Sequence, residues 1–467
     1  MSYSALTREL SKVRETVFGT TPAAPTMLEV RALKQYDFGV DQGAMESAEK
    51  KAHRMRMKSR LGNKKGQFSI PFQLSYGDFD DMFEEALGGT WTPIATCTAM
   101  IAAAASPTNT FTRAAGSFIT DGFAVGQQIV TSGFTAPADN ITAIVSAVTA
   151  TVLTVSAATT GMVVEASASR TISTTAQRLR VGNIFRSSTF EDRNPAANLY
   201  EQFNGAVISG FDLTIEPEKI ITGTFKGLVR DCVIAGVGNA AIAVDSAAKT
   251  FTCAAGGFLA TGASFRVGDN IITTGFTNPG NNGTFVISAV TDTVITCSAA
   301  AGLVTEVAGT GKNVYLGTLG TPTAASTNDP YDSFLGDIAE GTVDQAEATG
   351  IKINFENSMK PTYAILTPGA AAAASIKPDQ DIKAGGEISI FFANQEFKKK
   401  YLGGTESTVN VLVGSGLPGG KSMRFIMSAI QYTGNKRTTD STIVESAPFD
   451  ANYHAATATC IEIQRIP

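Results

Sequence analysis

Histidine is almost absent from this chain. Only His53 and His454 occur among 467 residues, and neither has neighbours at a spacing that suits a metal site. A cysteine or serine nucleophile would need one of these imidazoles as its base. His53 lies in a basic stretch and His454 between short predicted strands, so neither is well placed for that role. We expect no enzyme activity, no catalytic residue, no metal and no cofactor.

Cysteines and long apolar runs are also scarce. Five cysteines are spread along the chain without a C-x-x-C pair, which fits reduced thiols made in a cytoplasm. The longest runs of small apolar residues, 99–106 and 370–375, fall short of the roughly 20 residues that a membrane span needs. Residues 1–27 are interrupted by charges and lack the apolar core of a signal peptide. We expect neither secretion nor a membrane partner.

Charge is limited and slightly negative. Charged residues make up 17% of the chain and the formal net charge is −5, so the protein as a whole would repel nucleic acid. Hydrophobic residues make up 43%, and the remainder is rich in Ala, Thr, Gly and Ser. This composition is typical of β-rich modules with many turns.

One glycine-rich segment imitates a phosphate-binding loop. The segment 414–422, GSGLPGGKS, ends in Gly-Lys-Ser. The first glycine of such a loop would fall at position 415, which is Ser415, and residues 423–427 alternate like a strand instead of opening a helix. Nucleotide binding is therefore disfavoured.

Two segments poor in charge repeat each other. VGQQIVTSGFTAPADNITAIVSAVTATVLTVS (125–156) and VGDNIITTGFTNPGNNGTFVISAVTDTVITCS (267–298) share Val-Gly, Gly-Phe-Thr and Ser-Ala-Val-Thr at one constant offset. Short alternating runs between Gly, Asn and Pro turns predict small antiparallel β-modules. We expect one inserted module at 95–175 and a second at 236–315.

The remainder of the chain reads as an older duplication. QFSIPF (67–72) precedes FDDMFEEALGGTW, and EISIFF (387–392) precedes FKKKYLGGTES. IITGTF (220–225) is mirrored by VESAPF (444–449) in the same order. The apolar stripe before each LGGT predicts one short helix per copy, with Asp78 as a cap of the first and Gly88 as its left-handed stop.

The segment LSYGDFDDMFEEALGGTW, with VRALKQYDFGV before it and GAVISGFDLTIEPEKIITGTFKG and TIVESAPFDANY after it, resembles the tail tube (major tail) proteins of long, non-contractile-tailed bacteriophages. The resemblance covers 27–94, about 177–230 and about 335–467. It implies sandwich-like or barrel-like β domains with one helix each, duplicated in tandem. We expect domain 1 at 1–94 with 176–235, and domain 2 at 316–467.

Such proteins form stacked rings that build the hollow tube through which viral DNA leaves the capsid. The resemblance implies a virion tail protein made in the host cytoplasm, with itself, a tape measure protein and tail terminator or tip proteins as partners. Double-stranded DNA would pass through without specific binding. Two domains per chain predict homotrimeric, pseudo-sixfold rings; hexameric rings are the alternative.

Three sets of residues are candidates for assembly. In the shared LGGT alignment Glu84 and Glu85 correspond to Lys399 and Lys400. Lysines near a helix C-terminus suit its dipole and glutamates do not, so we expect the acidic helix to need an outside partner. The candidate intra-ring interface comprises Asp80, Asp81, Glu84, Glu85, Lys398, Lys399 and Lys400.

The basic stretch 50–65 contains eight Lys and Arg residues. It is interpreted as a solvated hairpin or loop, or as an arm that docks onto an acidic surface of the next ring; a DNA-binding arm is third, because no aromatic residues interleave to stack bases. The candidate arm residues are Arg54, Arg56, Lys58, Arg60, Lys64 and Lys65.

The third set lies on a predicted strand. Phe211, Leu213 and Ile215 alternate with the candidate lumen-facing residues Asp212, Thr214 and Glu216, giving an acid-bearing face that would repel DNA phosphates in a bore. The alternative function for the whole chain is a surface adhesin or glycan-binding β-repeat protein, suggested by the Thr-rich repeats.

Overall fold

The computed structural model describes residues 8–22, 25–46, 49, 55, 58–104, 108–156, 161–194, 199–260, 263–298, 302–341, 343–344, 348–364, 371–392, 395–414, 420–439 and 443–467. This part of the chain is mainly β, with a large antiparallel sheet, two closed barrels and two short helices, α1 (Asp80–Leu87) and α2 (Glu396–Gly403). The predicted fold class is confirmed. Neither helix is long or apolar enough to cross a membrane.

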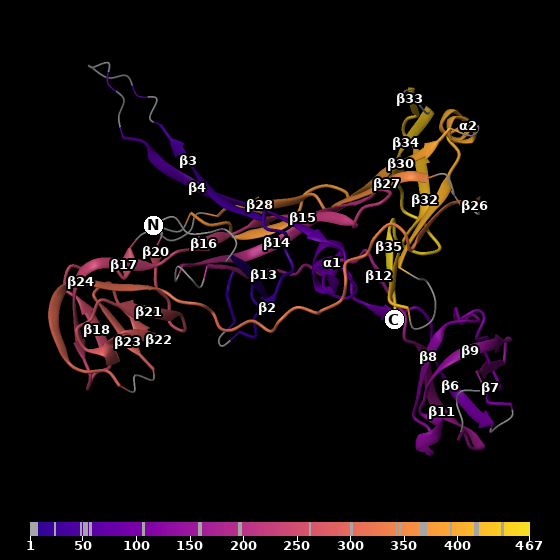
Figure 1. Cartoon of the computed structure of the whole chain (residues 1–467), viewed down its shortest axis with the longest axis horizontal. Helices are drawn as coiled ribbons and strands as arrows, with labels where there is room; N and C mark the ends of the chain where they lie inside the picture. Colours follow the sequence, from indigo (N-terminus) through magenta and orange to yellow (C-terminus); the bar gives the residue numbers. More distant parts are fainter. Residues whose placement is uncertain are drawn as a thin grey trace.

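Two separate barrels flank a central body (Figure 1). Barrel 1 consists of β6 (Thr96–Ala104), β7 (Thr110–Arg113), β8 (Gln128–Ser132), β9 (Thr142–Val148), β10 (Val152–Val155) and β11 (Glu165–Thr174). Barrel 2 consists of β17 (Gly236–Asp245), β18 (Thr250–Cys253), β21 (Asn270–Thr274), β22 (Gly283–Val290), β23 (Val294–Cys297) and β24 (Glu306–Leu316). Each barrel has its own phenylalanine-rich core. The two repeated segments therefore form equivalent structures.

The central body contains the remaining long strands. Its large sheet is built from β1 (Glu9–Arg14), β2 (Leu28–Glu29), β3 (Asp37–Met45), β4 (Arg60–Gln73), β5 (Thr92–Pro93), β12 (Gln177–Arg180), β13 (Ser188–Asn194), β14 (Leu199–Ile215), β15 (Thr222–Val229), β16 (Asp231–Val233), β25 (Gly336–Glu340), β26 (Val343–Asp344), β27 (Ala348–Glu356), β30 (Lys383–Phe391), β31 (Ser407–Gly414), β32 (Ser422–Tyr432), β33 (Lys436–Thr439), β34 (Ile443–Ala451) and β35 (Glu462–Ile466). Two small separate hairpins are β19 (Leu259–Ala260) with β20 (Ala263–Ser264), and β28 (Met359–Thr362) with β29 (Ser375–Pro378).

Eight strands of the body follow one another in two similar blocks. Block 1 has the order β3, β4, β15, β14, and block 2 has the order β27, β30, β34, β33. In each block the helix follows the second strand, β4 or β30. The blocks join directly, because β14 pairs with β27 in antiparallel register from Gly210 opposite Glu356 to Ile215 opposite Ile351.

The residue alignment predicted for the third strands is wrong by a few positions. Ile70 of β4 lies opposite Phe225 of β15, whereas its counterpart Ile390 of β30 lies opposite Glu445 of β34, not Phe449. The strands occupy corresponding places, but the similar letters of 220–225 and 444–449 are not in corresponding register.

One hydrophobic core runs through both blocks. Phe72 stacks on Phe225 at a centroid distance of 4.5 Å, and both are fully buried. Phe83 of α1 contacts Phe225 at 5.1 Å and reaches Phe425 of β32 at 6.3 Å. Aromatic contacts therefore link the two copies across the body.

The two helices end in the predicted way but begin differently. Gly88 has φ of +63° and Gly404 has φ of +58°, the left-handed conformation that glycine adopts most easily. Asp78 does not cap α1: the first flanking residue is Phe79 and no side chain caps it. Instead Asp78 accepts a hydrogen bond from Arg31 at 2.6 Å. The helix start is held by the loop around it.

Candidate assembly surfaces

Glu85 of α1 is buried and paired within its own chain. Its carboxylate lies 3.2 Å from the ammonium of Lys12 on β1 and accepts a hydrogen bond from Ser188 at 2.7 Å. Lys12 also lies 2.6 Å from Asp81. Burial alone would lower the pKa of Lys12, but the charges of Glu85 and Asp81 outweigh it and raise that pKa.

The other two acids of α1 also have partners. Glu84 lies 3.1 Å from Arg14 and accepts a hydrogen bond from the backbone N–H of Trp91. Asp80 forms an ion pair with Arg465 of β35. All four acids of the helix are therefore bound to cations of the same chain.

The expectation that the acidic helix needs an outside partner is therefore wrong. A strand far away in sequence supplies the countercharge, and it does so in the interior, where an unpaired glutamate would be strongly destabilising. A place for Asp80, Asp81, Glu84 and Glu85 in an intra-ring interface stays a prediction, since a single chain does not test it.

The lysines of α2 divide into buried and exposed groups. Lys400 donates to Glu340 of β25 at 2.8 Å, and the Glu340 side chain is only 4% exposed. Lys398 and Lys399 are exposed, and Lys399 pairs with Glu396 on the same helix at 2.9 Å. Only Lys398 and Lys399 face solvent as candidates for a contact between copies.

The pairs Glu85–Lys12 and Lys400–Glu340 are reversed in charge; both members of the first pair are buried, whereas in the second Glu340 is buried and Lys400 is half-buried. β1 pairs with β13 next to α1, and β25 pairs with β31 next to α2. In the first copy the helix supplies the acid and the strand the base; in the second the helix supplies the base and the strand the acid. Exchanging the two covering strands would bring like charges together inside the core.

The LGGT glycines serve different purposes in the two copies. A Cβ on Gly89 would lie 2.0 Å from the carbonyl oxygen of Arg180, and one on Gly88 would lie 2.9 Å from that of Gly182. The backbone of 182–184 donates to the carbonyls of Leu87 and Gly88. The segment returning from barrel 1 therefore presses on the end of α1. In the second copy a Cβ on Gly403 would meet only the Thr405 hydroxyl, at 3.2 Å.

The candidate inter-ring arm is only partly described. Arg54 and Arg56 lie outside the described residues, while Lys58, Arg60 and Lys65 are exposed. Lys64 instead pairs with Asp231 at 2.6 Å. The β3–β4 hairpin that carries this stretch projects away from the body (Figure 1). Its docking role stays a prediction.

The alternation on β14 is confirmed, with Phe211, Leu213 and Ile215 buried and Asp212, Thr214 and Glu216 on the other face. Asp212 pairs with Lys226 at 2.5 Å and Glu216 with Lys219. The hydrogen bond from Lys219 holds the pKa of Glu216 below its usual range.

This polar face continues across the junction of the blocks. Lys352 lies opposite Thr214, and Glu387 opposite Lys352. The face is therefore a mixture of both signs, and the expectation of an acid-bearing surface is corrected: its acids are balanced by neighbouring lysines. That it lines a bore stays a prediction.

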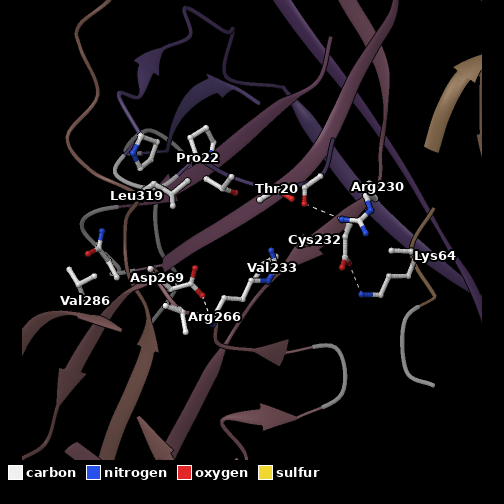
Figure 2. Close-up of a pocket in the computed structure, with 18 of the residues that line it drawn as sticks. Thr20, Pro22, Lys64, Arg230, Cys232, Val233, Arg266, Asp269, Val286 and Leu319 are labelled. Atoms are coloured by element: carbon white, nitrogen blue, oxygen red, sulfur yellow. Dashed lines mark hydrogen bonds and ion pairs between the residues drawn. The ribbon is translucent and has the colours of Figure 1, made fainter. Parts of the chain in front are cut away.

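A cavity of about 910 Å³ lies where barrel 2 meets the body. Figure 2 shows Arg230, Cys232 and Lys64 on one side and Arg266, Asp269 and Val286 on the other. Arg230 donates to the carbonyls of Gly19 and Ala373, each at 3.0 Å. Burial raises the pKa of Asp269. Lys64 pairs with Asp231, and Asp269 accepts the backbone N–H of Arg266 at 2.8 Å, so several charged groups of this cavity are engaged within the chain.

Of the two histidines considered for catalysis, His454 has a described position. His454 is half-buried and its Nδ1 lies 3.0 Å from the Thr457 hydroxyl, while His53 is outside the described residues. Residues 422–432 form strand β32, as the alternation after the imitated phosphate loop predicts. Among the residues with described positions, no cluster of His, Cys, Asp and Glu could hold a metal ion.

Sequence reasoning missed Lys12, Arg14 and Glu340, the partners of the helix charges. Alternation in 9–14 (ELSKVR) could have indicated a strand, but no local pattern tells which helix that strand covers.

Comparison with known proteins adds a family. No curated protein matches the chain significantly. The family model described as phage tail tube protein matches residues 6–278, more than half of the chain. Members of that family are structural proteins and not enzymes. Because this match covers more than half of the chain, the chain belongs to the phage tail tube protein family.

Proposed function

We propose that the chain polymerises into stacked rings that form the hollow tail tube of a long, non-contractile-tailed phage, the conduit for DNA ejection. The observation that carries this proposal is the β14–β27 junction, in which the last strand of block 1 pairs with the first strand of block 2. A chain that already joins block to block can join the same blocks between copies.

The outer edges of the eight-stranded run support this. Within the described residues β3 pairs only with β4, and β33 only with β34. Long open strand edges favour addition of further strands, and a closed ring removes them. Repeating the intrachain junction pairs β33 of one copy with β3 of the next.

The register of that contact follows from the intrachain junction. Asp212 lies opposite Asn354 there. When block 2 is matched to block 1 strand by strand through these pairings, Thr438 of β33 corresponds to Asp212 of β14. In the same way Asp41 of β3 corresponds to Asn354 of β27. We therefore expect Thr438 of one copy opposite Asp41 of the next.

The ring then contains three chains and six blocks, with six chains as the alternative. Its units are domain 1 (1–94 and 176–235), domain 2 (316–467) and the inserted modules at 95–175 and 236–315, which decorate the tube. Tape measure and terminator or tip proteins would bind this assembly in the virion tail, after synthesis in the host cytoplasm. DNA would pass along the mixed-charge face.

Cysteine cross-linking tests this arrangement. Adjacent antiparallel residues have Cα atoms about 4.5–5.5 Å apart, which suits a disulfide. Asp41→Cys with Thr438→Cys should give cross-linked oligomers on oxidation of the assembled protein, ending at three chains. Asp212→Cys with Asn354→Cys is the within-chain reference, and the unchanged protein controls for the native cysteines.

A series of cross-linked oligomers that ends at six chains would reject the trimeric ring but would leave the proposal of a tube standing. Tubes visible by negative-stain microscopy without any cross-link would reject the strand contact. An unassembled protein whose reference pair closes would reject the tube itself.

A further inference from the structure

Both barrels contain the same cluster of a carboxylate, a cation and a phenylalanine ring, which is called the clasp below. In barrel 2, Glu306 accepts backbone N–H groups of Thr277 and Asn278, both at 3.1 Å. Lys312 pairs with Glu306 at 2.9 Å and lies 5.0 Å from the centroid of the Phe276 ring. This ties the start of β24 to the loop between β21 and β22.

Barrel 1 repeats the clasp with different residues. Glu165 accepts the backbone N–H of Ala136 at 2.5 Å and pairs with Arg170. The Arg170 guanidinium lies 4.3 Å from the Phe134 ring centroid and donates to the carbonyl of Ile101 at 2.6 Å. A carboxylate, a cation and a phenylalanine therefore occupy corresponding places in both barrels.

One position in the clasp differs in its chemistry. In barrel 2 it is Asn281, whose amide donates to Glu306 at 3.0 Å and to the carbonyl of Val304 at 2.9 Å, while its oxygen accepts the N–H of Val304 at 2.9 Å. Asn281 is fully buried. The Asn281 amide therefore supplies a hydrogen-bond donor to one carboxylate oxygen of Glu306.

In barrel 1 the same position is Asp139. Its Oδ1 accepts the N–H of Val163 at 3.0 Å, as Asn281 does with Val304. Its Oδ2 is buried, and no hydrogen-bond partner for it is found among the described residues. The residue is 0% exposed. An ionised Asp139 would bring a second negative charge towards Glu165 and leave an oxygen unsatisfied, both of which are costly in the interior.

We propose that Asp139 is protonated in the folded protein at neutral pH and that its hydroxyl donates to Glu165, in the place of the Asn281 amide. Barrel 1 thus has a clasp that holds one proton, and barrel 2 has the same clasp without one. The charged groups that face Asp139 are Glu165 and Arg170. The charge of Arg170 is engaged by Glu165, so it does not replace the missing donor.

The ionisation properties of the pair agree with this assignment. Burial raises the pKa of Asp139, and the Glu165 charge adds to that rise against the opposing effects of Val163 and Arg170. The Ala136 N–H holds the pKa of Glu165 below its usual range. Of the two carboxyl groups, Asp139 is therefore the one that these surroundings favour as the proton carrier. Its contribution to folding is fully present below the ordinary aspartate value of 3.8 and is lost as pH rises through the raised folded value.

Reciprocal substitution tests the proposal on the full chain. Asp139→Asn supplies the amide that barrel 2 already has, and Asn281→Asp gives barrel 2 the acid. Calorimetry, with hydrogen exchange to assign each transition to a barrel, should show Asp139→Asn raising the melting temperature of barrel 1 at pH 7 by at least about 15 °C, because pH 7 lies about three units above the ordinary aspartate pKa of 3.8. The gain should shrink towards pH 4. Asn281→Asp should lower the melting temperature of barrel 2 at pH 7, and should lower it much less at pH 4.

Two results would overturn the proposal. One is a change in melting temperature from Asp139→Asn that is the same at pH 7 and pH 4, because folding would then not be linked to protonation of Asp139. The other is an Asn281→Asp barrel whose melting temperature has no added pH dependence. The second variant keeps the test valid if the first fails to fold. Infrared spectroscopy is an independent readout: we expect a band of a protonated carboxylic acid that Asp139→Asn removes.

Discussion

Glu85 of α1 and Lys400 of α2 hold corresponding positions before the shared LGGT, and each binds the opposite charge on the strand beside its own helix. Glu85 lies 3.2 Å from Lys12, and Lys400 lies 2.8 Å from Glu340. The reversal keeps both pairs satisfied and gives each helix a distinct covering strand. We infer that it prevents the two copies from exchanging their outer strands during folding, a form of specificity by charge repulsion.

Reversing the charge of Glu85 should strongly destabilise the body. Glu85→Lys would place three cations together, with Lys12 and Arg14, and breaking a buried pair costs roughly 3–5 kcal/mol. Urea unfolding measures the loss. Lys399→Glu reverses an exposed charge and should change stability by no more than about 0.5 kcal/mol. Equal effects of the two variants would contradict the burial argument.

Exchanging the charges of both Lys400 and Glu340 should restore much of the stability that is lost when Lys400 alone is changed. Lys400→Glu alone would face Glu340, and we expect a loss of about 2 kcal/mol, below the fully buried range because Lys400 is partly exposed. Adding Glu340→Lys should recover at least half of it. A double-mutant cycle gives the coupling energy. Additive losses would show that the pair is not the source of stability.

The two LGGT motifs should differ in their tolerance of alanine. Gly89→Ala would push a methyl group onto the Arg180 carbonyl and should cost roughly 1–3 kcal/mol or more. Gly403→Ala meets only a movable hydroxyl at a helical position and should be neutral or stabilising by up to about 1 kcal/mol. Thermal unfolding of both variants provides the comparison. Similar losses would contradict the close approach of the Arg180 carbonyl to Gly89; Gly403 itself corresponds to Gly88 in the LGGT alignment.

The body should unfold as one unit, separately from the barrels. Phe83→Ala removes a ring that contacts both copies and should lower the body transition by about 3–5 kcal/mol. Phe251→Ala, in the core of barrel 2, is the matched control and should lower the stability of that barrel alone. Calorimetry separates the transitions. Two body transitions, of which Phe83→Ala moves one, would show that the β14–β27 junction does not couple the blocks.

Much of the fold was predictable from local patterns. Period-two alternation around Phe68, Ile70 and Phe72 and along 211–216 indicated half-buried strands, and the stripe before LGGT indicated a helix. The repeat of 125–156 in 267–298 revealed equivalent modules. These features are determined by nearest neighbours along the chain, so the sequence contains them in readable form.

The partners of the charged side chains were decided only by the tertiary structure. Glu85 meets Lys12 across a separation of 73 residues, and Lys400 meets Glu340 across 60. No periodicity encodes such pairings, because they depend on which strand the sheet brings over which helix. For the same reason the acids of α1 looked exposed from helix geometry alone, and the face of Asp212 looked acidic before its lysines were in place. The sequence by itself determined the kinds of elements and their repetition; the three-dimensional packing decided which charges were left for a partner.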